Sequence, residues 1–394
     1  MSSPFAVRFH DVPVLPRGFR CAARNCGLKP TAKDLAIFVS DVEADAAAVF
    51  TRNQFPGAPI ILGRDTIRSG RLRAIVANSK VSNVATGPRG IEDARRMAAA
   101  AAGELGTSPD RVLVSSTGVI GIKLPIDLIE RGIRGMAGEL TADPLVGAEG
   151  IMTTDTHPKA LSASAGEATI TWVAKGSGMI EPNMATMLAY IFTDAAIDAP
   201  TLDRMLRAAV HLSFNMLTVD SDTSTSDTCA ILANGLAGTV DFNAFSDVLA
   251  AGCIRMAEML ARDGEGAQHL IRATVREAAS EADARRVAKS LVNSPLVKTM
   301  VHGADPNVGR LLMAIGKCAE CTIRADATDA WINGHAVVRR GQRVEFDDAE
   351  VRATLRAEVV TLEVSLGVGT ESATAFGCDL TQAYIDENAA YYSS

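Results

Sequence analysis

Residues 168–195 read ATITWVAKGSGMIEPNMATMLAYIFTDA, and this stretch decides the fold. β-branched and aromatic residues gather before Gly176 and again after Ala185, which predicts two strands. A connection containing Gly, Pro and Asn separates the strands and has Thr186 near its end. It is not a phosphate-binding loop, because Lys175 precedes the glycines and no Gly-Lys-Ser/Thr follows. Local chemistry alone leaves two interpretations, a glycine-rich turn or a catalytic loop.

The rest of the chain continues this alternation of strands and helices. Short apolar runs predict further buried strands at 35–50, 59–62, 74–78 and 359–366. Helices are predicted at 91–105, 201–212 and 244–262. The run RVLVSSTGVIG predicts a strand that ends in a turn holding Thr117 and Gly118, and the terminal DLTQAYIDENAAYYSS predicts a strand and a tail. The fold class is therefore α/β.

Length and composition limit the kind of protein. At 394 residues the chain favours two packed domains or one two-lobed unit, although no linker marks a boundary. Hydrophobic residues make up 47% and charged residues 22%, which is typical of a folded globular protein. The net charge of -7, with basic residues spread along the chain, argues against nucleic-acid binding and favours a small-molecule substrate.

The N-terminal sequence and the cysteines indicate the compartment. MSSPFAVRFHDVPVLPRGF lacks the apolar core of a signal peptide, and no apolar run is long enough to span a membrane. Seven cysteines without an export signal predict reduced thiols in a cytoplasmic protein. Cys318 and Cys321 form a C-x-x-C pair, but the spacing of Cys21 and Cys26 does not complete a convincing zinc site. We expect no metal.

The stretch KGSGMIEPNMATML at 175–188 closely resembles the signature of the ornithine acetyltransferase family, the bifunctional glutamate N-acetyltransferases of arginine biosynthesis. Similar blocks follow one another in the family order: SSTGVIG, IMTTDT, VDSDTSTSDT, RDGEGA, NSPLVKT, GADPNVGR and FGCDLT. The resemblance therefore extends along nearly the whole chain.

This resemblance implies self-cleavage between Ala185 and Thr186 and a layered α/β fold of the N-terminal nucleophile-like kind. The products would be an N-terminal chain 1–185 and a C-terminal chain 186–394 that stay folded together. The resemblance also implies assembly into a heterotetramer of two α and two β chains.

The implied chemistry is acyl transfer through Thr186. Once freed, its α-amine has an ordinary pKa of about 8, so the residue carries its own base and needs no histidine. Thr117 and Gly118 match the family's oxyanion-hole pair, and a glycine beside a hydroxyl suits that role because it lets the backbone approach closely. No bound cofactor is implied, and the use of acetyl-CoA as an acetyl donor stays open.

The resemblance also assigns residues that bind the substrate. Lys175 matches the lysine that contacts the substrate carboxylate, and Thr153 is favoured over Thr154 as a hydroxyl donor. Glu265 matches the acid that meets the substrate amino group. Asn388 and Ser393 match the pair that closes the site, although the tail is one residue longer and Ser394 is an alternative to Ser393.

Some positions depart from the family pattern. Lys80 and Val81 stand where small residues are common, His269 where Lys is frequent, and Val308 where Trp is frequent. These changes affect the expected identity of the substrate more than the expected reaction. They allow an enzyme of this family that serves specialised amino-acid metabolism.

The resemblance predicts a ping-pong enzyme that moves acetyl from N2-acetylornithine to glutamate. The alternatives are a self-cleaving aminopeptidase-type hydrolase, an acyltransferase for another amino-acid-like substrate, and a non-catalytic amino-acid-binding protein. A Ser294/Lys298 nucleophile pair is a weaker alternative, because four-residue spacing is common on helices.

Overall fold

The computed structural model describes residues 7–181 and 187–389. The chain forms two compact units, each built from several segments. The first unit comprises Met1–Gly176, Pro182–Asn215 and Thr223–Met256, and the second comprises Ser177–Glu181, Met216–Asp222 and Ala257–Ser394. The units and the predicted cleavage products are thus different divisions of the chain, because each unit takes residues from both sides of the Ala185–Thr186 bond.

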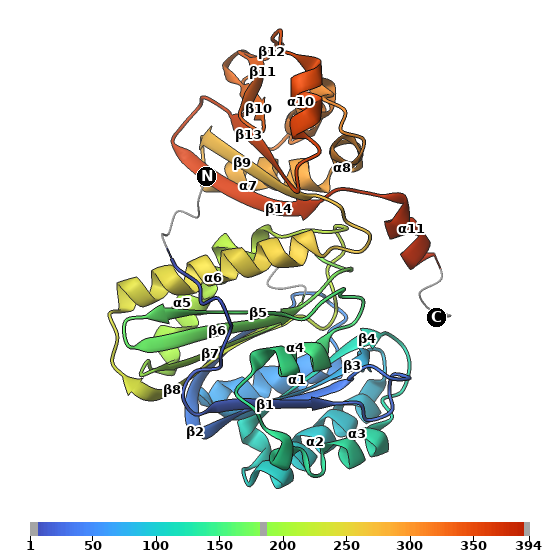
Figure 1. Ribbon diagram of the computed structural model, residues 1–394, viewed down its shortest axis with the longest axis vertical. Coiled ribbons are helices and arrows are strands. Elements are labelled where there is room, and N and C mark those ends of the chain that lie inside the picture. Colours follow the sequence, from blue (N-terminus) through green and yellow to red (C-terminus); the bar gives the residue numbers. More distant parts are fainter. Residues whose placement is uncertain (1–6, 182–186, 390–394) are drawn as a thin grey trace. The chain divides into compact units, whose positions relative to one another are not determined.

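The first unit is built on an eight-stranded sheet in which neighbouring strands follow the order β4-β3-β2-β8-β7-β6-β5, with β1 paired to β2 (Figure 1). The strands are β1 Phe19–Arg24, β2 Leu35–Phe50, β3 Arg71–Val81, β4 Val112–Val119, β5 Lys159–Ala165, β6 Ala168–Lys175, β7 Leu188–Ala195 and β8 Thr228–Gly238. The two strands predicted around the Gly/Pro/Asn connection are confirmed. They are β6 and β7, which pair antiparallel from Ile170 opposite Thr193 to Lys175 opposite Leu188.

Side chains of the first unit's sheet alternate between two cores. Along β2, Phe38 joins one apolar cluster and Ile37 joins the other, as expected for a strand whose neighbours point to opposite faces. The cluster around Ile37 includes residues of helices α2 (Gly87–Leu105) and α3 (Ile126–Ile133), whereas the cluster around Phe38 includes residues of α4 (Pro144–Ile151). Because helices cover both faces, strands of this sheet can be buried on both sides, as in β7, where every residue is buried.

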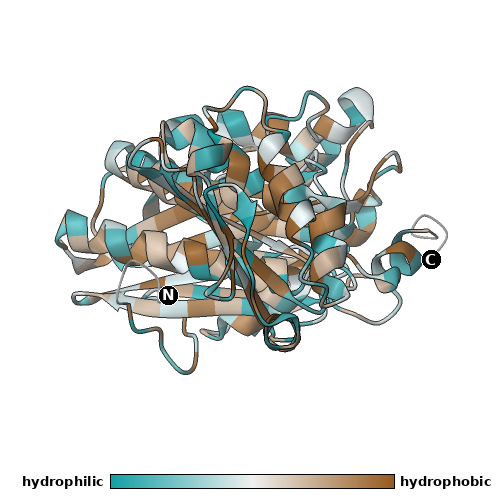
Figure 2. Ribbon diagram, turned by 90° about the horizontal axis from the view of Figure 1, so that it is seen from above, coloured by the Kyte–Doolittle hydropathy of each residue, from teal (hydrophilic) through white to brown (hydrophobic). Residues whose placement is uncertain are grey.

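The helices of this unit follow from local signals. They are α1 Ala58–Thr66, α2 Gly87–Leu105, α3 Ile126–Ile133, α4 Pro144–Ile151, α5 Ala199–Leu212 and α6 Phe242–Arg262, of which α6 passes into the second unit after Met256. Helix α2 begins four residues earlier than predicted, with a proline in its first turn, and ends at Gly106 in the left-handed conformation. Brown and teal alternate along the helices in Figure 2, as expected where one side is buried.

The predicted strand at 59–62 is wrong, because these residues lie in α1. A short apolar run cannot distinguish a strand from a buried helical segment, and here Pro59 occupies the first turn of a helix.

The second unit carries a six-stranded sheet in the order β12-β11-β10-β13-β9-β14. Its strands are β9 Leu270–Ala278, β10 Asp329–Ile332, β11 His335–Arg339, β12 Gln342–Arg343, β13 Val359–Ser365 and β14 Glu371–Cys378. Its helices are α7 Glu281–Asn293, α8 Pro295–His302, α9 Val308–Gly316, α10 Asp348–Thr354 and α11 Gln382–Asn388. The mixed α/β class predicted from the sequence is confirmed, and the strand predicted at 359–366 is β13.

The strand predicted near the C-terminus is wrong. Residues 382–388 form α11, and the Thr381 side chain accepts a hydrogen bond from the backbone N–H of Tyr384 at the start of that helix. A threonine in this position is a common N-cap and competes with strand formation. Within residues 7–181 and 187–389, no helix is both long and apolar enough to cross a bilayer.

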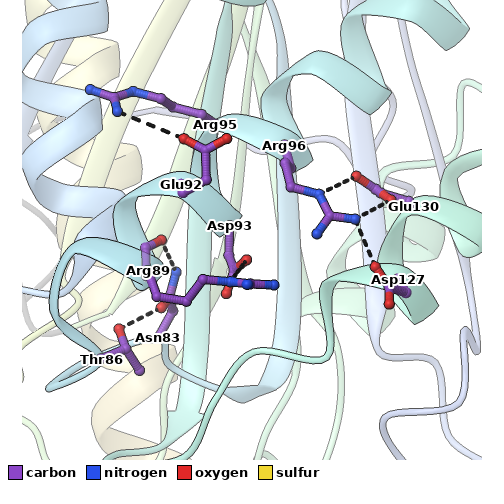
Figure 3. A network of polar contacts seen from close by, with 10 residues as sticks. Asn83, Thr86, Arg89, Glu92, Asp93, Arg95, Arg96, Asp127 and Glu130 are labelled. Atoms are coloured by element: carbon purple, nitrogen blue, oxygen red, sulfur yellow. Dashed lines mark hydrogen bonds and ion pairs between the residues drawn. The ribbon is translucent and has the colours of Figure 1, made fainter.

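A polar network holds the start of α2 and the loop before it (Figure 3). Asn83 donates to the backbone oxygen of Gly90 at 2.8 Å and accepts from the Thr86 hydroxyl at 2.8 Å. A Cβ atom on Gly90 would lie 2.0 Å from Thr86 Oγ1, so this turn of the helix requires glycine. Further along α2, Arg96 binds Asp127 and Glu130 of α3, each at 2.7 Å.

We predict that Gly90→Ala lowers the free energy of unfolding by about 1–3 kcal/mol, because the added methyl group overpacks this network. Gly103→Ala in the same helix is the matched control, since nothing lies within 4 Å of a Cβ atom there. The control is expected to raise stability by about 0.5–1 kcal/mol, because alanine favours the helix over glycine. Urea denaturation of both variants measures the difference, and equal effects would contradict the prediction.

Candidate active site

The predicted site residues fall in three groups. Thr117, Gly118, Thr153 and Lys175 belong to the first unit, and Glu265 and Asn388 belong to the second. Ala185, Thr186 and Ser393 lie outside the described residues.

Thr117 and Gly118 lie at the end of β4, beside the parallel strand β3. Thr117 pairs with Ser79 and Gly118 pairs with Lys80. The two residues were predicted in a turn, but the strand continues through Val119 because β3 continues beside it. Gly118 has φ +124°, and a Cβ atom there would lie 2.2 Å from the carbonyl carbon and oxygen of Lys80. Only glycine fits, so the backbone at this strand end is tightly fixed.

One buried carboxylate, Asp155, organises the predicted carboxylate-binding residues. It accepts hydrogen bonds from the backbone N–H of Thr153 at 2.9 Å and from that of Gly176 at 2.7 Å. Gly176 directly follows Lys175, whose Nζ donates to Thr153 Oγ1 at 3.4 Å. The structure thus brings Thr153 and Lys175 together by holding the backbone of both segments.

Asp155 is itself neutralised by a buried lysine. Lys159 Nζ donates to Asp155 Oδ1 at 2.7 Å, and both side chains are fully buried. Burial by itself raises the pKa of Asp155, but Lys159, Lys175 and the hydrogen bonds to the carboxylate outweigh burial and hold this pKa below its ordinary value. The carboxylate therefore stays ionised and keeps accepting hydrogen bonds.

The second unit holds Glu265 and Asn388 in direct contact. Asn388 Nδ2 donates to Glu265 Oε2 at 2.8 Å and to the backbone oxygen of Tyr384 at 3.0 Å. Glu265 is buried, and a Cβ atom on Gly178 would lie 2.2 Å from its carboxylate. Gly178 thus lets the backbone pack closely on this acid.

The second unit holds two further acidic groups with shifted pKa values, Asp220 and Glu387. Burial raises the pKa of Asp220, although the backbone N–H groups of Met179 and Ile180 donate to its carboxylate. Burial also raises the pKa of Glu387, and the negative charge of Glu265 raises it further. A buried carboxylate such as that of Glu265 can bind an ammonium group.

Sequence reasoning missed Asp155 and Lys159. Their four-residue spacing in the block TTDTHPK was a usable signal for an ion pair, but nothing local indicated that the pair would be buried. The Ser294/Lys298 alternative is not supported, because Ser294 caps α8 and Lys298 Nζ donates to the backbone oxygens of Val219 and Cys378. Within the described part of the chain, no cluster of three or more His, Cys, Asp or Glu side chains could hold a metal ion.

The sequence model of the ArgJ family matches residues 20–393. The chain belongs to the ArgJ family. The resemblance drawn from the sequence blocks is therefore confirmed, and it spans both units.

Relatives in the ArgJ family align along nearly their full length. "Arginine biosynthesis bifunctional protein ArgJ 2" of Nostoc sp. is 44% identical over 390 residues, covering 95% of this chain and 97% of the relative. "Glutamate N-acetyltransferase Oat2" of Streptomyces clavuligerus is 40% identical over 392 residues, covering 97% and 99%. The crystal structure of ArgJ from Bacillus halodurans matches with TM-score 0.50 and 38% identity, covering 51% of this chain and 98% of that one. The N-terminal nucleophile-like fold class is confirmed.

We predict that Asp155→Asn lowers the free energy of unfolding by about 3–5 kcal/mol, because it removes the carboxylate bound to the buried Lys159 ammonium. Adding Lys159→Met removes that charge, so the double variant is expected to recover at least about 1 kcal/mol. Urea denaturation of the single and double variants measures this coupling.

The partly exposed Lys33–Glu149 ion pair, at 2.7 Å, is the matched control. Glu149→Gln is expected to cost at most about 1 kcal/mol. Additive effects of the Asp155 and Lys159 substitutions would show that the two side chains are not energetically coupled.

Proposed function

We propose that this chain is a self-cleaving N-acetyltransferase that moves acetyl from N2-acetylornithine to glutamate. The observation that carries the proposal is the match to the ArgJ family across residues 20–393, together with a relative named glutamate N-acetyltransferase that aligns over 97% of this chain. Because this alignment includes both units, the proposal concerns the whole enzyme rather than one domain.

Self-cleavage creates the nucleophile. The Thr186 hydroxyl attacks the Ala185 carbonyl carbon, and the bond to the Thr186 nitrogen breaks as that nitrogen takes up a proton. Water then hydrolyses the resulting ester, which releases the Ala185 carboxylate and leaves Thr186 with a free α-amine and a free hydroxyl. The Bacillus halodurans chain supports a cut near the middle, because nearly all of it corresponds to half of this chain.

Acetyl transfer then takes place in two steps. Thr186 Oγ attacks the acetyl carbonyl of acetylornithine, its proton passes through the α-amine to the leaving nitrogen, and ornithine departs from an acetyl-threonine ester. The amine of glutamate attacks this ester, and Thr186 regains its proton as N-acetylglutamate leaves. Both steps pass through a negatively charged tetrahedral intermediate. Thr117 and Gly118 are the proposed donors to that oxygen, and the rigid backbone at Gly118 suits a preorganised site.

The remaining predicted residues bind the amino-acid part of each substrate. Lys175 and Thr153, held together by Asp155, are proposed to bind the α-carboxylate. Glu265 is proposed to meet a substrate ammonium group, with Asn388 orienting its carboxylate and Ser393 completing the pair. The route requires no metal or bound cofactor. The two cleaved chains are proposed to assemble as two α and two β chains in the cytoplasm.

Intact mass spectrometry tests the cleavage. Wild-type protein is expected to give two fragments, ending at Ala185 and beginning at Thr186, because the threonine hydroxyl makes the cut. Thr186→Ala is expected to give one intact chain of about 41.4 kDa. Fragments of the same size in both proteins would show that another group or a contaminating protease cuts the chain.

Ornithine release tests the transfer. With acetylornithine as donor, continued release of ornithine is expected to require one molecule of glutamate for each ornithine released. The reason is that the acetyl-enzyme must transfer its acetyl group to glutamate before it can react again. Chromatography of ornithine and N-acetylglutamate measures both products. Ornithine release that ignores glutamate would identify a hydrolase instead, and transfer from acetyl-CoA in the same assay decides whether it is a second donor.

A further inference from the structure

Helix α4 ends just before Thr153, and its last turn contains no basic residue of its own. The final carbonyl groups of a helix lack partners within the helix, and its C-terminal end favours a nearby positive charge. Both requirements are met by residues from other segments of the first unit. The Ser79 hydroxyl donates to the backbone oxygen of Gly150 at 3.0 Å, and Lys29 Nζ donates to that of Met152 at 2.7 Å.

The Lys29 ammonium uses its three N–H groups for three oxygens. Besides the Met152 oxygen, Nζ binds Ser79 Oγ at 2.8 Å and the backbone oxygen of Lys33 at 3.1 Å. Ser79 therefore accepts from Lys29 and donates to the end of α4, so the two side chains belong to one connected set of hydrogen bonds. An ammonium has three donors, whereas a neutral amine has two, so loss of the proton would remove one of these contacts.

The loop that carries Lys29 is fixed independently of α4. The buried carboxylate of Asp34 accepts from the backbone N–H groups of Cys26, Leu28 and Lys29, at 2.7, 2.7 and 2.8 Å. The backbone oxygen of Asp34 accepts from the N–H of Ser79 at 2.8 Å, which ties the loop to β3. Lys29 thus reaches the end of α4 from a fixed loop, and its ammonium can set the direction in which the chain leaves the helix.

One peptide group, between Met152 and Thr153, is held from both sides. Its oxygen accepts from Lys29 Nζ at 2.7 Å, and its N–H donates to Asp155 Oδ2 at 2.9 Å. Because a peptide group is planar, it cannot turn without lengthening one of these two hydrogen bonds. The orientation of the Thr153 side chain therefore depends on Lys29 as well as on Asp155.

We infer that Lys29 is a positioning residue for substrate binding, because its ammonium holds the Met152–Thr153 peptide group so that the Thr153 hydroxyl meets the substrate carboxylate. The inference rests on the proposed function, which assigns this carboxylate to Thr153 and Lys175. Lys29 does not touch the substrate in this arrangement, and its effect passes through Thr153.

Isothermal titration of the purified full-length protein with ornithine and with putrescine tests the inference. Putrescine keeps both ammonium groups of ornithine but lacks the carboxylate, so the ratio of the two affinities isolates the contribution of the carboxylate. Wild type is expected to bind ornithine more tightly. Lys29→Met is expected to lower the ratio about three- to tenfold, because the hydrogen bond from Thr153 to the carboxylate is no longer aligned.

Lys33→Met is the matched control. Lys33 belongs to the same loop and contacts the same helix, but its ammonium binds only the side chain of Glu149, at 2.7 Å, and not the end of the helix. The control is expected to keep the wild-type ratio. An unchanged ratio in Lys29→Met, or an equal fall in Lys33→Met, would overturn the inference.

A double-mutant cycle with Thr153→Val separates positioning from a general loosening of the fold. Valine has the shape of threonine without the hydroxyl, so this change removes the group through which Lys29 is inferred to act. Adding Lys29→Met to Thr153→Val is therefore expected to change the ratio by no more than about twofold. The same loss in both backgrounds would show that Lys29 acts by another route.

Melting temperatures of all variants show whether they fold. If Lys29→Met does not fold, Ser79→Ala takes its place, because it removes the other hydrogen bond to the end of α4. This variant is also expected to lower the ratio, and an unchanged ratio would then overturn the inference.

The charge of Lys29 gives an independent readout. Burial is the main cause that lowers the pKa of Lys29 to about 8. Asp34 and Asp155 oppose this effect, whereas Lys175 and Lys80 add to it. The third N–H donor is therefore present below about pH 8 and is lost as the pH rises through this value.

The wild-type ratio of affinities is expected to fall across that pH range. Lys29→Arg stays charged and is expected to remove this fall. Comparison of the two proteins cancels the titration of the ligands, which is common to both. The same pH dependence in both proteins would contradict a role for the Lys29 charge.

The outcomes distinguish this inference from the proposed function. If wild type binds ornithine no better than putrescine, the assignment of the carboxylate to Thr153 and Lys175 fails, and the inference fails with it. If Thr153→Val lowers the ratio and Lys29→Met does not, only the inference fails. If both lower it without additivity, the inference stands even when acetylornithine supplies no acetyl group, and only the proposed reaction fails.

Discussion

The buried ion pair of Asp155 and Lys159 is the interaction on which the first unit's part of the site depends. A carboxylate in this environment stays ionised only because a cation and backbone donors compensate for the water it has lost. Those donors belong to the two segments that carry Thr153 and Lys175. The hydrogen bonds that compensate for burying this charge thus also position the two side chains proposed to bind the substrate carboxylate.

The neighbouring β3–β4 pair imposes a steric constraint of a different kind. Gly118 is forced to be glycine by the carbonyl of Lys80, while Lys80 itself occupies a backbone conformation that favours glycine. Steric fit alone therefore does not account for the lysine at position 80. Strain kept at such a position is consistent with a selected side chain.

Local sequence patterns predicted the elements with strong periodicity. β6, β7 and α2 could be recognised because β-branched residues, apolar runs and an Ala-rich segment act over a few neighbouring residues. The local patterns did not predict the helices at 58–66 and 382–388. A short apolar run fits a strand as well as a helix in the first case, and the N-cap role of Thr381 gives the only local signal in the second. Asp155 was missed for another reason. Its hydrogen bond from the backbone N–H of Gly176 joins residues far apart in the sequence, and no local pattern encodes such a pairing.

The strand order has a consequence for the cleaved protein. β7 and β8 follow the proposed cleavage point, yet they lie between β2 and β6, which precede it. The two products are therefore interleaved within one sheet, and neither can leave without breaking hydrogen bonds on both sides. Folding of the uncut chain is unimolecular, whereas reassembly after denaturation of the cut protein requires two chains to meet and so depends on concentration. The uncut chain could refold readily after unfolding. The cut protein would instead stay folded largely because it unfolds slowly.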